Sequence, residues 1–593
     1  MQSNEDMWGK LLGGLIGMLV AVWLLVVVLA SLVALVQCGQ LPQRLGPGAV
    51  LGLFRYGKQA LATESGCAPS TTAMGVLVLV FLVLVAALVV AGVIMWLRWR
   101  ESDRKLLLDL RWRRGIAKAP EVRRKAGRKA LMQKASVVRP TLDDPQAEDV
   151  GWKLGSSQGR EVWVSSEDSV VILGPPRSGK GFFIAINALL DAPGAVVTTS
   201  TRGDNVRAVW EARKRIGPVA LFDPQGLTKL PTTLKWHPAQ GCESAMTAAR
   251  RAQAIVGASS MGQSTSNQEW AGVATQIMQY LLHAAAIGEV DAPTLGRWGA
   301  SPGLAEQAVR ILKESPAAAA GWGEALDAEL NSDPRMLPSK WMGVTSATSS
   351  LMLPEVADVL NPAWGEGLEP EKFLKEKGTL FLVGTKSGGG AAGPMLMALM
   401  DAITWAARDM AISLPGNRLD PPLSLILDEI ANMAAWRELP TIMSDGGGVG
   451  ISTLVILQSP GQARAQWGQY ETEQILGSAT VTVQLGGSSG AEDLGRIVSL
   501  AGQRKITDQS RTSSDSGVSV AEQSRQDDVV TVSELRRLPT GTGFMLKANV
   551  RPVVVTMSRW TQRKDAEEIK AAIARFDKRL AQALTSGAET VGR

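Results

Sequence analysis

The 593-residue sequence predicts an α/β fold with an inserted all-α region, preceded by two apolar helices. Three observations predict it. Two long runs near the N-terminus, 11–36 and 74–97, contain no charged residue. Several short apolar runs that suit buried strands end in glycine-rich or acidic turns. Between them, residues 240–355 follow a helical pattern with few β-branched runs.

Composition excludes a disordered chain, because apolar residues make up 45% and charged residues 20%. The net charge of +6 is unevenly distributed. Residues 98–139 hold fifteen Lys and Arg against four Asp and Glu, so the rest of the chain is slightly acidic. Any nucleic-acid contact is therefore expected to be local.

Cysteine and histidine are scarce, with three and two residues and no CxxC pair. This argues against a Cys/His zinc site. Cys38 and Cys67 flank one loop, and a disulfide between them is left open.

Each uncharged run is long enough to cross ~30 Å of hydrocarbon as a helix. The first lacks the basic N-terminal region of a signal peptide. Loop 37–73 has three basic residues, whereas the basic segment 98–139 follows the second run. The positive-inside rule then predicts a cell-membrane protein with both termini in the cytoplasm. The basic segment suits anionic lipid headgroups of the bilayer, and DNA phosphate is the alternative.

A glycine-rich loop follows the apolar run 170–173 and precedes a helical run. Strand, loop and helix are the context of a phosphate-binding P-loop. Lys180 would reach the β- and γ-phosphates of ATP. Gly181 stands where Ser or Thr usually binds Mg²⁺, so water would replace that ligand. The predicted nucleotide-binding residues are Gly174, Pro175, Pro176, Arg177, Ser178, Gly179, Lys180 and Gly181.

A second motif lies in 423–429, a buried strand that ends in two acids. Asp428 would hold Mg²⁺, and Glu429 would polarise the attacking water as general base. We expect both acids to reach the loop from a neighbouring strand. Strand 451–457 ends in Gln458, a candidate sensor of the γ-phosphate or the water. The predicted catalytic residues are therefore Glu429, Lys180 and Gln458.

These motifs resemble the type IV secretion coupling proteins, the TraG/TraD-like conjugation ATPases, over about residues 11–560. The most specific stretch is 439–468, with its glycine turn, strand and Gln-Ser ending. Two motifs depart from the family pattern: Arg202 stands for a lysine, and Gly447 opens a turn that often has arginine. No arginine finger can be carried over, and Arg504 and Arg551 are only weak candidates.

The resemblance implies a RecA-like P-loop nucleotide-binding domain with an inserted all-α domain, preceded by two transmembrane helices. Trp270 is expected in the all-α core. The polar run 507–528 predicts a flexible loop, and 561–585 an amphipathic helix that is either solvated or a docking surface. The predicted segments are a cytoplasmic tail (1–10), spans 11–36 and 74–97 around outer loop 37–73, a basic linker (98–150), the nucleotide-binding domain in two parts (151–239 and 356–560), the all-α domain (240–355) and a C-terminal helix and tail (561–593).

The resemblance also implies a homohexamer that uses ATP and Mg²⁺. Its partners would be the membrane proteins of a type IV secretion channel and single-stranded DNA bound to a relaxase, the relaxosome. Three alternatives stay open: an FtsK-like septum translocase of duplex DNA, an ATPase for protein effectors, and a scaffold with an inactive P-loop.

Overall fold

The computed structural model describes residues 33–41, 62–67, 70–100, 102–262, 267–385, 392–514 and 517–591, together with Val28 and Ser31. They fall into two compact units, 1–105 and 106–593.

The first unit contains one long apolar helix, α3 (Thr71–Arg100). Within the described residues, Leu82–Arg100 is the one stretch long and apolar enough to cross a membrane by length and composition. Nearly all the side chains of Leu82–Arg100 are exposed, with Leu88 at 71%, as expected of a helix that needs an apolar surrounding. The second predicted span lies in α3, whereas most of the first, 11–36, lies outside the described residues. Cys38 and Cys67 form a disulfide with a Cα–Cα distance of 6.0 Å.

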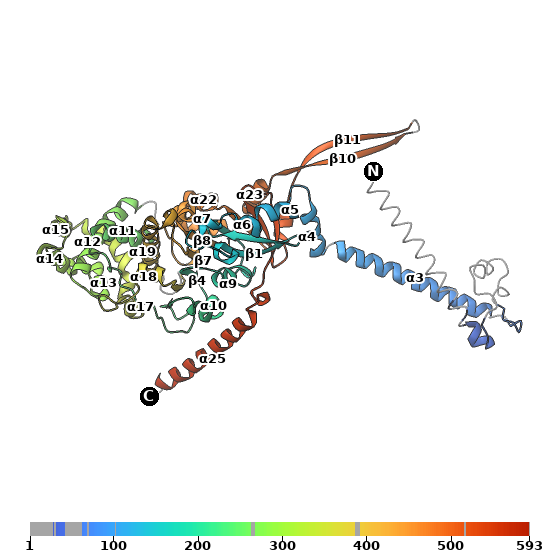
Figure 1. Ribbon diagram of the computed structural model, residues 1–593, viewed down its shortest axis with the longest axis horizontal. Coiled ribbons are helices and arrows are strands. Elements are labelled where there is room, and N and C mark those ends of the chain that lie inside the picture. The colour runs from blue at the N-terminus through green and yellow to red at the C-terminus, as the bar shows by residue number, and fades with distance from the viewer. Residues whose placement is uncertain are drawn as a thin grey trace. The chain divides into compact units, whose positions relative to one another are not determined.

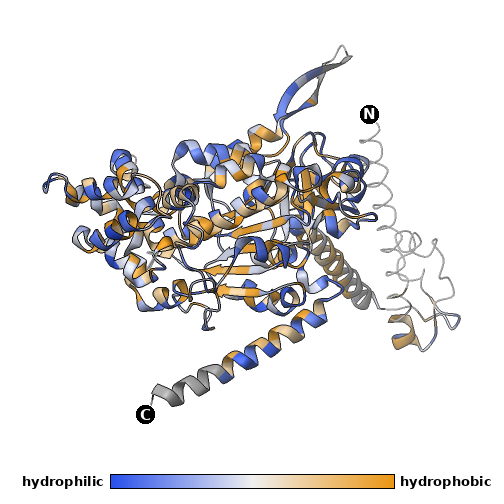
Figure 2. Ribbon diagram, turned by 60° about the vertical axis from the view of Figure 1, so that its left-hand side comes forward, coloured by the Kyte–Doolittle hydropathy of each residue, from blue (hydrophilic) through white to orange (hydrophobic). Residues whose placement is uncertain are grey.

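The second unit is built on a mixed sheet (Figure 1). From edge to edge its strands are β2 (Arg160–Ser165), β1 (Gly151–Ser157), β13 (Val553–Met557), β12 (Thr542–Lys547), β9 (Val481–Leu485), β3 (Val170–Leu173), β8 (Ile451–Leu457), β7 (Leu423–Asp428), β4 (Val196–Ser200), β6 (Thr379–Val383) and β5 (Val219–Phe222). Neighbours from β9 to β5 pair in parallel, and those from β2 to β9 pair antiparallel. Strands such as β3 are buried along their whole length, which explains their uninterrupted apolar sequences (Figure 2).

Strand β8 lies between β3 and β7, so the expectation that the acidic strand directly neighbours the loop strand is wrong. The parallel register pairs Leu173 with Leu457, and Ile456 with Asp428. The carboxyl ends of the three strands therefore meet at one edge of the sheet, where ligands of open α/β sheets bind.

Helices join the strands and cover the sheet. Those outside the insert are α4 (Asp103–Trp112), α5 (Ala119–Lys125), α6 (Arg128–Met132), α7 (Ala135–Val138), α8 (Ala147–Val150), α9 (Ile186–Leu190), α10 (Asp204–Lys214), α18 (Pro370–Lys375), α19 (Gly393–Ile412), α20 (Leu439–Asp445), α21 (Pro460–Trp467), α22 (Gln469–Gly477), α23 (Ala491–Ala501), α24 (Val532–Arg536) and α25 (Ala566–Val591). The predicted linker 98–150 contains packed helices, and Val122 is fully buried.

Between β5 and β6, residues 245–360 are mostly helical where the structure describes them. The helices are α11 (Ala245–Ala258), α12 (Gln268–Ile287), α13 (Ala292–Ala300), α14 (Glu306–Glu314), α15 (Trp322–Leu330), α16 (Leu337–Thr348) and α17 (Pro354–Leu360). One apolar core joins them to the sheet through residues such as Phe222, Ile277 and Leu399. Trp270, expected in the core, is only half-buried in the first turn of α12.

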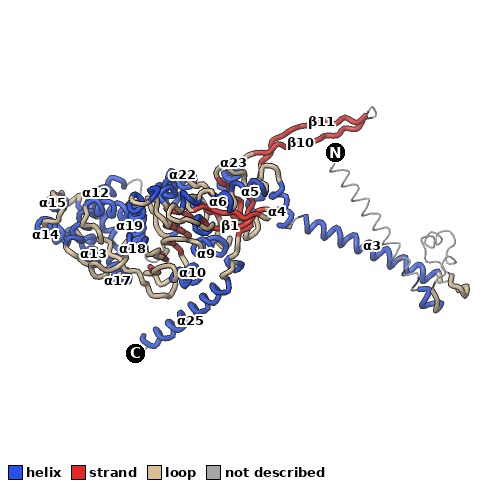
Figure 3. Tube along the Cα trace, viewed as in Figure 1, coloured by secondary structure: helices blue, strands red, loops and turns tan. Residues whose placement is uncertain are grey.

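The polar run 507–528 is not a loop. Strands β10 (Gln503–Ser514) and β11 (Gly517–Asp528) pair antiparallel as a two-stranded sheet that projects from the body of the unit (Figure 3). The polar composition of this run does not reveal the strands. The β-branched residues that favour strands, such as Ile506 and Val518, are scattered among Ser, Asp and Gln.

Candidate functional site: a phosphate-binding loop facing two acids

The loop after β3 lines one side of a cavity. The helix that follows begins as a π-helical turn, Gly181–Ala185, and continues as α9. Gly179 has φ 84°, and a Cβ there would lie 2.6 Å from the Phe183 ring, so only glycine fits. Arg177 also has a left-handed φ of 64°. The positive φ angles of these two residues give the loop the tight turn that the sequence pattern of a phosphate-binding loop predicts.

The cavity has a volume of about 670 Å³, within the usual range for small-molecule sites. Predicted loop residues that line it are Pro176, Arg177, Ser178, Gly179, Lys180 and Gly181, and both acids, Asp428 and Glu429, line it too. Gly174, Pro175 and Gln458 are not among the lining residues. The structure therefore brings the loop and the acids into one cavity across 248 residues of sequence.

Lys180 points into the site from the end of the loop. Its side-chain Nζ donates a hydrogen bond to the Gly174 carbonyl at 2.9 Å, and the residue is 7% exposed. Burial lowers the pKa of Lys180, whereas the carboxylates of Asp428 and Glu429 act in the opposite direction. The lysine and both acids are thus close enough to influence each other's charge.

Asp428 closes strand β7. Its carbonyl accepts a hydrogen bond from the Thr199 hydroxyl on β4 at 3.0 Å. Burial raises the pKa of Asp428 to about 6, and the Glu429 carboxylate adds to this shift while Lys180 opposes it. Among the described residues, Asp428 Oδ1 finds no hydrogen-bond partner although it is buried. A buried carboxylate oxygen in this state is suited to a cation.

Glu429 adopts a left-handed conformation with φ 56° directly after the strand. Two side chains hold its carboxylate: the Thr201 hydroxyl donates to Oε2, and Gln458 Nε2 donates to Oε1 at 3.4 Å. The strained backbone and these two donors aim the carboxylate at the cavity. Gln458 therefore contacts the predicted general base, and its role as a sensor of the γ-phosphate or the water stays a prediction.

Mg²⁺ suits this donor set. Gly181 lacks the usual hydroxyl, but a Cβ at Gly181 would lie 3.5 Å from Asn205 Oδ1. Asn205, on α10, is 3% exposed, and its side chain hydrogen-bonds to the Asp428 carboxyl, which acts to lower the pKa of that acid. Carboxylate and amide oxygens are ligands that Mg²⁺ accepts, directly or through water. Asp428 and Asn205 would hold the ion there.

Sequence reasoning missed several lining residues, some directly after the loop in sequence and others from distant segments. They are Phe182, Ile186, Thr201, Asn205, Arg207, Trp560 and Ile573. Arg202, the lysine substitute, also lines the cavity. The two weak arginine-finger candidates pair elsewhere in the same chain: Arg504 with Asp527 at 3.3 Å, and Arg551 with Glu121 at 2.6 Å.

Together, the fold and the cavity define a P-loop protein of RecA-like architecture with a helical insert. Residues 422–540 match the family model described as the TraM recognition site of TraD and TraG. The comparison with curated protein sequences yields no match. The resemblance to TraG/TraD-like coupling proteins is confirmed.

Among solved structures, the fold is similar to the bacterial conjugative coupling protein TrwBdeltaN70 in its unbound monoclinic form. The TM-score is 0.51 at 18% identity, over 68% of this chain and 88% of that chain. TrwB in complex with ADP and Mg²⁺ gives 0.48 at 17% identity over 72% and 91%, and VirB4 of Thermoanaerobacter pseudethanolicus gives 0.37 at 12% over 69% and 96%. At these identities the first similarity shows the fold, and the two weaker ones add no argument.

Proposed function

We propose that this chain is a membrane-anchored ATPase that couples a DNA substrate to a conjugative type IV secretion channel. One observation supports it above all: Lys180, Asp428 and Glu429 converge on one cavity at the carboxyl edge of a parallel sheet. The family match over 422–540 supports the conjugative role.

ATP would bind with its phosphates on the loop, where Lys180 contacts the β- and γ-oxygens. Mg²⁺ held by Asp428 supplies charge neutralisation of the phosphate oxygens. Glu429 takes the proton of the attacking water, and Thr201 and Gln458 keep its carboxylate oriented. Lys180 would offset part of the negative charge that develops on the phosphate oxygens during transfer.

In this proposal the protein is a homohexamer at the cytoplasmic face of the cell membrane, anchored by two spans with both termini inside. It recruits single-stranded DNA bound to a relaxase and passes it to the membrane proteins of the channel. ATP hydrolysis drives the strand forward.

Steady-state ATP turnover by the purified full-length protein tests the proposal. Lys180→Ala should abolish turnover, and an unchanged rate would refute the site assignment. Stimulation of the wild-type rate by single-stranded DNA supports conjugation. Stimulation by duplex alone favours an FtsK-like translocase, and the absence of any DNA effect favours an ATPase for protein effectors.

A further inference from the structure

An apolar wall lines one side of the nucleotide cavity. Four of its residues are Phe182, Ile186, Trp560 and Ile573. The rings of Phe182 and Trp560 meet edge to face with centroids 5.9 Å apart. Phe182 is 37% exposed, and Trp560 and Ile573 are half-buried, so this surface is open to the cavity.

The segment that carries Trp560 is fastened to the helix after the loop. Asn187 Nδ2 donates to the Ser558 carbonyl at 2.9 Å. Arg563 pairs with Asp191 at 2.7 Å, just beyond the end of α9. Contacts on both sides of Trp560 therefore hold its ring at a defined distance from the P-loop helix.

Helix α25, which carries Ile573, packs against α10 on the other flank of the cavity (Figure 1). Arg579 pairs with Glu211 at 2.9 Å, and Arg207 pairs with Asp577. Phe576 on the same helix is 6% exposed and belongs to the core below. Because the apolar side of α25 faces the body of the unit, its Ile573 contributes to the apolar wall of the cavity.

We infer that Phe182, Trp560 and Ile573 form the subsite for the nucleobase of the bound nucleotide. The inference rests on the proposed function, because the phosphates must first lie on the loop at Lys180. Phe182 follows that lysine by two residues, so the apolar wall begins where the loop ends and its helix starts. Aromatic and aliphatic side chains pack against the flat face of a base, and every base has such a face.

Calorimetric binding of two ligands to the full chain, with Mg²⁺ present, tests the subsite. ATP carries the base, and inorganic tripolyphosphate presents only the phosphates. Trp560→Ala should weaken ATP binding by about tenfold and leave tripolyphosphate binding unchanged. An equal loss for both ligands, or no loss for ATP, would overturn the inference.

Two further variants protect the test against a folding defect. Trp560→Phe should retain most of the ATP affinity, and Ile573→Ala should give a smaller loss that is again confined to ATP. Trp405→Ala is the matched control, because Trp405 is 48% exposed and lines a different cavity. It should change neither affinity.

The wild-type protein separates the two proposals. Binding of neither ligand would refute the nucleotide site and the subsite together. Tripolyphosphate binding as tight as ATP binding would refute the subsite alone. Tighter ATP binding that Lys180→Ala weakens, with tripolyphosphate binding weakened as well, supports both.

Discussion

Asn205 is the residue whose role depends most on its surroundings. It lies 24 positions after Gly181 in sequence, yet its side chain occupies the space beside that glycine. Its side chain also hydrogen-bonds to the Asp428 carboxyl, so the amide adjoins both the glycine and the acid. The amide oxygen of Asn205 therefore lies where it can replace the hydroxyl that the loop lacks.

Asn205→Ala should weaken Mg²⁺ binding to the nucleotide-loaded protein by about tenfold, as losses of groups around a metal do. Titration with Mn²⁺ followed by electron paramagnetic resonance measures this. Gly181→Ser in the same background should restore affinity, because a Cβ there meets only ordinary contact distances. Unchanged metal affinity in Asn205→Ala would contradict this role.

Asp401, on α19, lines a second cavity of about 420 Å³ between α11 and helices α18 and α19. Burial raises the pKa of Asp401 to about 6, and the Glu438 carboxylate adds to the shift. Arg251, Arg250 and Arg408 oppose it. A folded-state pKa above the ordinary value means that the folded chain disfavours the ionised form.

Asp401→Asn should therefore stabilise the folded protein at about pH 7.5. The free energy of unfolding should rise by on the order of 1 kcal/mol after allowance for solvent screening, and the melting temperature should rise with it. As the pH falls below about 6, the folded wild-type carboxyl takes up its proton and this cost declines, and it is lost completely only below the ordinary pKa of 3.8, where the unfolded chain is protonated too. The gain should shrink towards about pH 5. Thermal melts across this range measure it, and a gain independent of pH would contradict the assignment.

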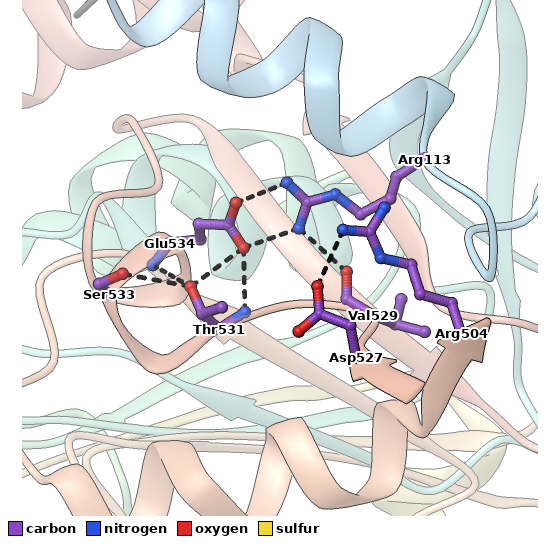
Figure 4. A network of polar contacts seen from close by, with 7 residues as sticks. All are labelled: Arg113, Arg504, Asp527, Val529, Thr531, Ser533 and Glu534. Atoms are coloured by element: carbon purple, nitrogen blue, oxygen red, sulfur yellow. Dashed lines mark hydrogen bonds and ion pairs between the residues drawn. The ribbon is translucent and has the colours of Figure 1, made fainter. Parts of the chain in front are cut away.

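At the scale of elements, the root of the β10–β11 hairpin is tied to the segment just after α4 (Figure 4). The two Arg113 guanidinium nitrogens donate to both Glu534 carboxylate oxygens at 2.5 and 2.8 Å, and one also donates to the Val529 carbonyl at 3.1 Å. Glu534 completes the capping box of α24 with Thr531. One arginine thus holds the chain on both sides of Thr531.

Arg113→Ala should destabilise this root by roughly 2 kcal/mol, because it leaves a largely buried carboxylate unpaired. Limited proteolysis should then cut the hairpin region faster than in the wild type. Arg504→Ala is the matched control: it removes one 3.3 Å contact to a half-exposed Asp527 and should have little effect. Equal protection of both variants would show that Arg113 is not what holds the root.

At the scale of the whole molecule, two spans predict an N-terminus on the same side as the C-terminus. If α3 were the sole span, the N-terminus would lie on the opposite side. A green fluorescent protein fused to either end should fluoresce in the cytoplasm, whereas alkaline phosphatase should be active only when inserted in loop 37–73. An active phosphatase at the N-terminus would contradict the two-span prediction.

Sequence reasoning worked where a signal is contiguous. The loop that ends at Lys180, the strand that ends at Asp428 and the apolar helix over 74–97 each follow from residues adjacent in the chain. It failed for the hairpin, whose polar composition resembles that of a loop although the backbone pairs over its length. The prediction that β3 and β7 are direct neighbours is also wrong, because strand order is decided by packing.

The sequence by itself determined that this chain carries a glycine-rich loop between a strand and a helix, two acids after a buried strand and a long uncharged helix, since each is a local pattern with its own physical cause. Only the tertiary structure decided that β8 separates the two motif strands, that Asn205 stands beside Gly181, and that Trp560 and Ile573 close the cavity. These residues are far apart in sequence. Long-range packing of the sheet, and of α10 and α25 against it, brings them together, and local patterns carry no record of that packing.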